Sequence, residues 1–321
     1  MLLLGQVNDA RTRADRLMGA VRNTREEELY ALSMLLAGRI AWLAGNWEAA
    51  ADNMEKGALT ISKFDQAEAQ QSFGFAAWPR AQLGQFDRAR AAVERHAKYG
   101  LAQNNDAIQT RANYYGNCVD FFQGCYPAVV ASQEPISKST SRVGEPILVS
   151  VTTGFSGYAL TMLGHAERGL TMIEAGIEGI EEAGSTVTLT YMYGLLAEML
   201  ALAESKERCL RTAHKGLSLM RTGERYGEST LHRALAMGHA LEPSDWHSVE
   251  KHMEICLRLC REREEHPTEA VALFRFAEIL HRRGINALAN DRLNNAIALF
   301  ADMQMAWWLE KALRFKELHD M

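Results

Sequence analysis

A glycine that ends one apolar stretch recurs along this chain at spacings of 40, 39, 40 and 40 residues. Two residues after each glycine lies a bulky or apolar residue, and five residues after it lies a small one. A repeated helix–turn–helix unit explains why the same residue types recur at the glycine and at the second and fifth positions after it, because every repeat must build the same turn and the same close contact. The glycines are Gly5, Gly45, Gly84, Gly124 and Gly164.

The repeat predicts an all-α chain that winds as a right-handed superhelix of helix pairs with a period of about 40 residues. We expect one solenoid domain over residues 1–321, with a lone second helix over 1–22, seven pairs over 25–302 and a closing helix over 304–319. The expected pairs are 25–44 with 47–62, 66–83 with 86–99, 105–123 with 126–134, 147–163 with 166–183, 187–203 with 206–221, 228–241 with 245–264, and 268–283 with 286–302. The stretch from Pro135 to Pro146, with four Ser/Thr residues, is typical of a linker.

A small residue stands seven positions before most turns, where the two helices of a pair cross most closely. The positions are Gly38, Ala77, Asn117, Gly157, Ala197 and Ala277. This pattern resembles the tetratricopeptide repeat, with Gly38, Gly45, Trp47 and Ala50 as the matching residues of the first full pair. The resemblance implies a binding or scaffolding role, although the period is longer than the usual tetratricopeptide period.

Both ends of the sequence carry apolar residues that a terminal repeat would normally hide behind a polar cap. Met1–Leu4 precede a turn that lacks its first helix, which favours a chain truncated upstream, and Trp307-Trp308 begin the closing helix. We therefore expect that the terminal helices are able to pair two copies of the chain as a homo-oligomer.

Charge and composition exclude several classes of partner. The formal net charge is −5, which gives no electrostatic reason to bind nucleic acid or an anionic membrane directly. No apolar run approaches the length that spans a bilayer, and five cysteines do not form a paired framework. We expect a cytoplasmic protein.

Candidate chemistry is sparse. His252, Cys256 and Cys260 share one helix face, but their spacing spreads three ligands over about 12 Å, so packing is favoured over a zinc site. No spacing of nucleophile, base and acid supports catalysis, and no phosphate loop is present. We expect no enzyme activity, no cofactor and no metal.

The first helices of tetratricopeptide pairs line the concave surface of the superhelix, and residues beside the small packing position point into it. Large aromatic side chains in such a groove are typical of binding surfaces. Tight packing between neighbouring pairs is the alternative explanation for the same residues. The groove candidates are Arg39, Trp42, Trp78, Arg111, Tyr114, Phe121, Tyr158, Tyr191, Glu198, Glu278 and His281.

Three runs between Asp106 and Arg233 carry a closer resemblance. They are residues 156–169, residues 195–198, and residues 221–233 with Arg221-Thr222-Gly223-Glu224-Arg225-Tyr226 at their start. Together they resemble the C-terminal repeat region of large bacterial signalling proteins that carry an AAA-type ATPase and either a cyclase or a winged-helix domain. The resemblance implies a module that regulates an ATPase and its output domain, both absent from this sequence.

The sequence thus predicts a non-catalytic interaction module that binds a protein or peptide segment in its concave groove. A small-molecule sensor with an enclosed aromatic pocket and a self-association module remain alternatives. An enclosed pocket would favour the sensor, whereas an open groove would favour a peptide.

Overall fold

The computed structural model describes residues 7–21, 26–220 and 223–320, and this part of the chain contains sixteen helices and no strand. The prediction of an all-α superhelix built from tetratricopeptide-like pairs is confirmed. Met1–Leu4 and Gly5, on which the truncation and one pairing surface were predicted, lie outside the described residues, as do Arg221 and Thr222. The helices are α1 (Val7–Val21), α2 (Glu27–Leu43), α3 (Trp47–Ile61), α4 (Gln66–Gln82), α5 (Phe86–Ala102), α6 (Asp106–Gln123), α7 (Tyr126–Val143), α8 (Pro146–Met162), α9 (Ala166–Glu182), α10 (Leu189–Leu202), α11 (Lys206–Leu219), α12 (Glu228–His239), α13 (Trp246–Glu262), α14 (His266–Arg282), α15 (Asn286–Asp302) and α16 (Ala306–Leu318).

Close helix crossings explain why small residues recur seven positions before the turns. At Gly157 a Cβ atom would lie 2.6 Å from the Gly169 carbonyl oxygen and 2.7 Å from the Ile173 nitrogen. Backbone atoms of α9 therefore occupy the space that any larger side chain on α8 would need. Asn117 is the exception, and its amide donates hydrogen bonds to the Val129 carbonyl at 3.2 Å and the Ser132 hydroxyl at 2.7 Å.

The linker predicted from Pro135 to Pro146 is wrong, because α7 continues through Pro135 to Val143. Proline removes one backbone donor from a helix. Ile136 and Thr140 lie on the buried face of the continuing helix, so tertiary packing of α7 against α8 outweighs that loss.

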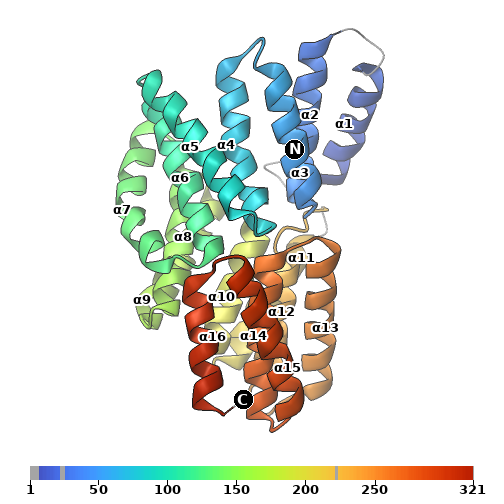
Figure 1. Cartoon of the computed structure of the whole chain (residues 1–321), viewed down its shortest axis with the longest axis vertical. Helices are drawn as coiled ribbons and strands as arrows, with labels where there is room; N and C mark the ends of the chain where they lie inside the picture. The colour runs from blue at the N-terminus through green and yellow to red at the C-terminus, as the bar shows by residue number, and fades with distance from the viewer. Residues whose placement is uncertain (1–6, 22–25, 221–222, 321) are drawn as a thin grey trace.

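The superhelix closes on itself. Figure 1 shows α1–α6 in the upper part of the molecule and α10–α16 in the lower part. Three hydrogen bonds join distant segments: Trp47 Nε1 donates to Glu265 at 3.1 Å, the Arg225 amide donates to the Leu43 carbonyl at 2.8 Å, and Trp308 Nε1 donates to the Tyr126 hydroxyl at 3.0 Å. The C-terminal helices thereby cover the turns that follow α2 and α6.

Two of the recurring glycines serve this closure as well as their own turns. Gly84 and Gly124 have φ angles of +74° and +82°, in the left-handed region that favours glycine. A Cβ atom would lie 2.5 Å from the Met303 sulfur at Gly84 and 2.7 Å from Trp308 Cδ1 at Gly124. The missing side chains thus let the C-terminal helices approach the turns directly.

Trp308 is 1% exposed, so it belongs to the interior and does not offer a free apolar end. Its neighbour Trp307 is half-buried and packs edge-on against Tyr126 at 4.8 Å between ring centroids. None of the helices in the described ranges combines the length and apolar character needed to cross a membrane.

Candidate functional site

The aromatic residues predicted for the concave groove lie in the interior. Trp78, Tyr114, Tyr158 and Tyr191 are 2%, 4%, 2% and 6% exposed, so these rings are packed inside the protein and do not form an exposed binding surface. Pro267, Thr268, Val271 and Trp308 of the C-terminal helices lie beside Tyr158 and Tyr191, so closure of the superhelix covers these two rings.

These rings form a continuous column inside the superhelix. Trp42 packs against Trp78 at 5.4 Å between centroids, and Trp78 packs against Phe155 at 5.9 Å. Phe155 stacks on Phe121 at 4.0 Å, and Phe121 contacts Tyr158 at 5.6 Å. Edge-to-face and offset contacts of this kind stabilise a core beyond the area that they bury.

An apolar cavity with a volume of about 530 Å³ lies at the N-terminal end of the column. We name it the α2–α8 cavity because its walls come from α2, α4, α6, the start of α8 and the linker before α10. Four groove candidates, Arg39, Trp42, Trp78 and Tyr114, lie in its walls. The complete lining is Arg39, Trp42, Leu43, Phe75, Trp78, Tyr114, Tyr115, Gly144, Glu145, Pro146, Ile147, Leu148, Val151, Val187 and Thr188.

Charges at the cavity are paired with one another. Arg39 forms an ion pair with Glu68 at 2.8 Å. Arg111 forms one with Glu145 at 2.5 Å, and this hydrogen-bonded carboxylate raises the pKa of Arg111. Arg111 also donates a hydrogen bond to Gln71 at 3.2 Å. This groove candidate is not itself part of the cavity wall, but its ion pair holds Glu145, which is.

The remaining candidates do not line the cavity. Phe121, Tyr158 and Tyr191 surround a void of only about 30 Å³ together with Arg233. Its volume is about that of one water molecule. These three aromatic residues therefore act as core residues in this structure.

Glu198 lies fully buried in an ionic cluster. Its carboxylate contacts Arg233 at 2.6 Å and Arg275 at 3.1 Å, and it accepts a hydrogen bond from the Tyr158 hydroxyl at 3.1 Å. Burial opposes ionisation of Glu198, but the two guanidinium charges outweigh it and lower its pKa. Glu278 pairs with Arg275 at 2.9 Å.

His281, the last groove candidate, packs near the C-terminus. Its ring lies 5.6 Å from that of Phe315 and 4.2 Å from that of His319. His281 does not line the α2–α8 cavity.

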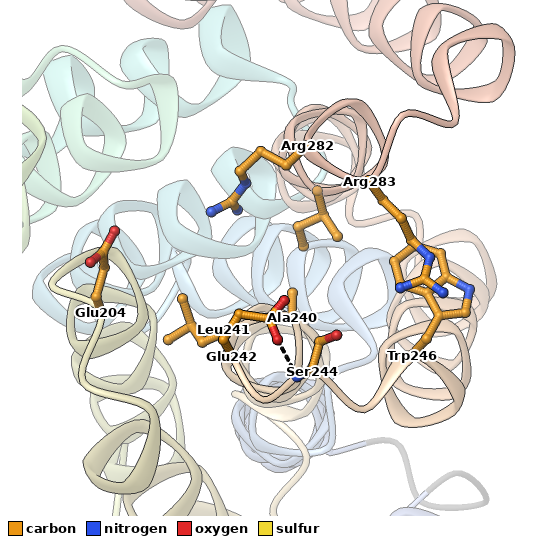
Figure 2. A pocket seen from close by; sticks show the side chains of 9 residues that line it. Glu204, Ala240, Leu241, Glu242, Ser244, Trp246, Arg282 and Arg283 are labelled. Carbon is orange, nitrogen blue, oxygen red and sulfur yellow. Dashed lines mark hydrogen bonds between the residues drawn. The ribbon is translucent and has the colours of Figure 1, made fainter.

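A second, polar cleft of about 410 Å³ lies at the turns of the later repeats. Figure 2 shows Arg282 and Arg283 from the end of α14 on one side and the turn with Glu242 on the other. Arg283 lies over the Trp246 ring at 4.3 Å. The charged residues of this cleft are exposed to solvent, which weakens their interactions.

The residues considered for zinc lie in two different environments. Cys256 and Cys260 are fully buried, whereas His252 contacts His232 with 2.9 Å between their Nδ1 atoms and stacks on His239. Within the described ranges, no group of three or more His, Cys, Asp or Glu side chains has a geometry that would hold a metal ion.

Sequence reasoning missed several residues of the cavity wall. Tyr115 follows Tyr114 in the sequence, Phe75 packs edge-on against Trp42 at 5.2 Å between ring centroids, and the start of α8 contributes Ile147 and Leu148. Thr188 enters from the linker before α10, which no repeat offset identifies. An aromatic pair at adjacent positions, as at Tyr114-Tyr115, was the one available signal.

The fold defines a tetratricopeptide-like superhelical protein, and several solved structures share it. A Rap protein in complex with Competence and Sporulation Factor matches with a TM-score of 0.72 at 10% identity, over 93% of this chain and 86% of that one. The Rap conjugation gene regulator of plasmid pLS20, in complex with the Phr* peptide, matches with a TM-score of 0.71 at 13% identity, over 86% and 75%. Aspartyl phosphate phosphatase F from Bacillus subtilis matches with a TM-score of 0.61 at 11% identity, over 89% and 74%.

At these identities the likeness describes the fold. No protein-family model matches the chain, and no curated protein matches its sequence.

Proposed function

We propose that the chain is a non-catalytic regulatory repeat module that binds a segment of a protein partner at the α2–α8 cavity, and that residues 1–321 form one solenoid domain. The position of the cavity carries the proposal. First helices of successive pairs build most of its walls, and about 530 Å³ is free between them. Apolar walls with a few polar groups are typical of binding sites.

Two observations support a peptide as the occupant. The Rap protein and the pLS20 regulator share this fold, and their names describe complexes with Competence and Sporulation Factor and with the Phr* peptide. The cavity also opens beside Gly144–Pro146, a turn at the surface, so an extended segment is able to enter with one side chain.

The sequence resemblance over residues 106–233 supports a regulatory setting. We propose that the module regulates a signalling ATPase or a cyclase-type protein, because the resembling regions accompany such domains. The five cysteines are free and four of them are buried, which supports a reducing, cytoplasmic location.

A small-molecule sensor is the second candidate. The volume of the α2–α8 cavity, about 530 Å³, lies within the range of small-molecule pockets, and its aromatic walls suit an apolar ligand. Peptide selection tests the first candidate directly, because it asks whether the cavity accepts a residue of an extended chain.

The test is selection of a random peptide library on the wild-type chain, followed by binding to two variants. Ile147→Trp fills the cavity, whereas Leu170→Trp enlarges a half-buried residue of α9 outside it. We expect enriched peptides that share an apolar residue and bind Leu170→Trp but not Ile147→Trp. Peptides that bind both variants equally, or a library without enrichment, would contradict the proposal.

A further inference from the structure

A second hollow adjoins the α2–α8 cavity. It has a volume of about 600 Å³ and lies between the end of α7, the start of α8 and the end of α9. The walls of both spaces include the turn Gly144, Glu145 and Pro146, so this turn borders the one and the other. We name the second space the outer hollow, and beyond the turn Ser141 of α7, Ser150 of α8 and Glu182 of α9 line it.

The turn between the two spaces carries no side chain at Gly144. A Cβ atom at this residue would have no contact within 4 Å apart from its chain neighbours, so the surface above Gly144 is open. A segment with one side chain in the α2–α8 cavity is therefore able to pass over the turn and place a nearby side chain in the outer hollow. Three extended residues cover about 10 Å, which is enough to cross a turn of this size.

The outer hollow carries a carboxylate without a partner. Glu182 is exposed and forms no ion pair within the part of the chain that the structure describes. Glu145, in the shared turn, is already paired with Arg111 at 2.5 Å. No lysine, arginine or histidine lines the outer hollow, and Arg142 in the last turn of α7 lies outside its walls. Glu182 thus leaves the hollow with a net negative charge.

Helix ends add to this negative charge. α7 ends at Val143 and α9 ends at Glu182, and both ends border the outer hollow. The C-terminus of a helix carries a partial negative charge of about half an elementary charge. The N-terminus of α8 also borders the hollow, and its partial positive charge offsets one of the two C-termini. The charge that best complements the hollow is therefore positive.

We propose that the partner segment carries a lysine or arginine within three residues of the apolar residue that fills the α2–α8 cavity, and that this basic side chain lies in the outer hollow beside Glu182. A long basic side chain suits the position, because its methylene groups pack on the half-buried Val149 while its charge stays near the carboxylate and water. This inference rests on the proposed function and adds the charge pattern of the partner segment.

The experiment selects peptides of seven residues, with phenylalanine at the central position and three random residues on each side. Acetyl and amide groups block the ends, so terminal charges do not compete. Selection on the wild-type chain should enrich lysine or arginine at a preferred position, and selection on Glu182→Lys should lose this enrichment. Glu178→Lys is the control and should keep it, because Glu178 is exposed on the same helix but does not line the outer hollow.

A double-mutant cycle with one selected peptide isolates the contact. Glu182→Gln in the chain and glutamine for the basic residue of the peptide should each weaken binding by about two- to fivefold, the scale of an exposed ion pair. The two changes together should weaken it little more than either alone. Removing a carboxylate from the C-terminal end of a helix is favourable, so both variants of Glu182 should fold, and circular dichroism checks this.

Selected peptides without a preferred basic position, or equal effects of Glu182→Lys and Glu178→Lys, would overturn the inference. Losses that simply multiply in the double-mutant cycle would overturn it as well. The proposed function fails separately, when the selected peptides bind Ile147→Trp as tightly as the wild type. Peptides that require an open cavity but show no basic preference would leave the proposed function standing and remove only the inference.

Discussion

Two glycines inside helices should respond to alanine in opposite directions. Around Gly157 a Cβ atom would lie 2.6 Å from the Gly169 carbonyl oxygen and 2.7 Å from the Ile173 nitrogen. Around Gly116 in α6 the nearest atom is Val93 Cγ1, at an ordinary contact distance of 3.6 Å. The two sites share a helical backbone and differ in the space beside it.

The magnitudes follow from this difference. Alanine in a helix interior is more stable than glycine by about 0.5–1 kcal/mol, so Gly116→Ala should stabilise the chain by about that amount. Overpacking costs about 1–3 kcal/mol, and the upper end applies at Gly157 because the obstructing atoms are backbone. After the gain in propensity, Gly157→Ala should destabilise by about 2 kcal/mol, and Gly157→Leu by more than about 3 kcal/mol.

Urea unfolding followed by circular dichroism measures both changes against the wild type. We expect the midpoints of Gly116→Ala and Gly157→Ala to move in opposite directions. Equal midpoints for the two alanine variants would refute the helix register that places Gly157 at the closest crossing of α8 and α9.

Three further predictions concern buried groups. Burial lowers the pKa of His96 to about 4, below its ordinary value of 6.5, so the folded state prefers the neutral ring. The contribution of this group to the free energy of unfolding is present above pH 6.5 and is lost as the pH falls toward 4. The free energy of unfolding of the wild type should therefore be about 2 kcal/mol lower at pH 5 than at pH 7. Urea unfolding at both pH values measures the change, and His96→Leu should not show it. Glu198→Ala should destabilise by about 3–5 kcal/mol, because it leaves the guanidinium groups of Arg233 and Arg275 without their shared carboxylate, and a change below 1 kcal/mol would contradict the buried cluster. Tyr158→Ala should lower stability by about 3–5 kcal/mol as a core substitution, and an unchanged melting temperature would return Tyr158 to an exposed groove.

Local patterns predicted most of the fold. The glycine turns and the small residues before them placed the helices to within a few residues, because both features act within one pair. The error at α7 has the same origin. Pro135 and the serines after it are typical of a linker, whereas the burial of Ile136 and Thr140 depends on contacts with other helices.

The candidate site was only partly accessible from the sequence. Repeat offsets identified Arg39, Trp42, Trp78 and Tyr114, which do share one cavity. The same offsets failed for Tyr158 because closure of the superhelix depends on contacts such as Trp308 with Tyr126, far apart in sequence. The repeat pattern of the sequence does not predict which turns contact helices that lie far along the chain.

Hydrogen–deuterium exchange with a selected peptide tests the central claim most directly, because it maps where the chain is covered. Binding at the α2–α8 cavity should slow exchange in residues 144–151 and around Thr188, and leave α13 (Trp246–Glu262) unchanged, since α13 contributes no residue to the cavity. Protection confined to α13, with residues 144–151 unaffected, would contradict the account.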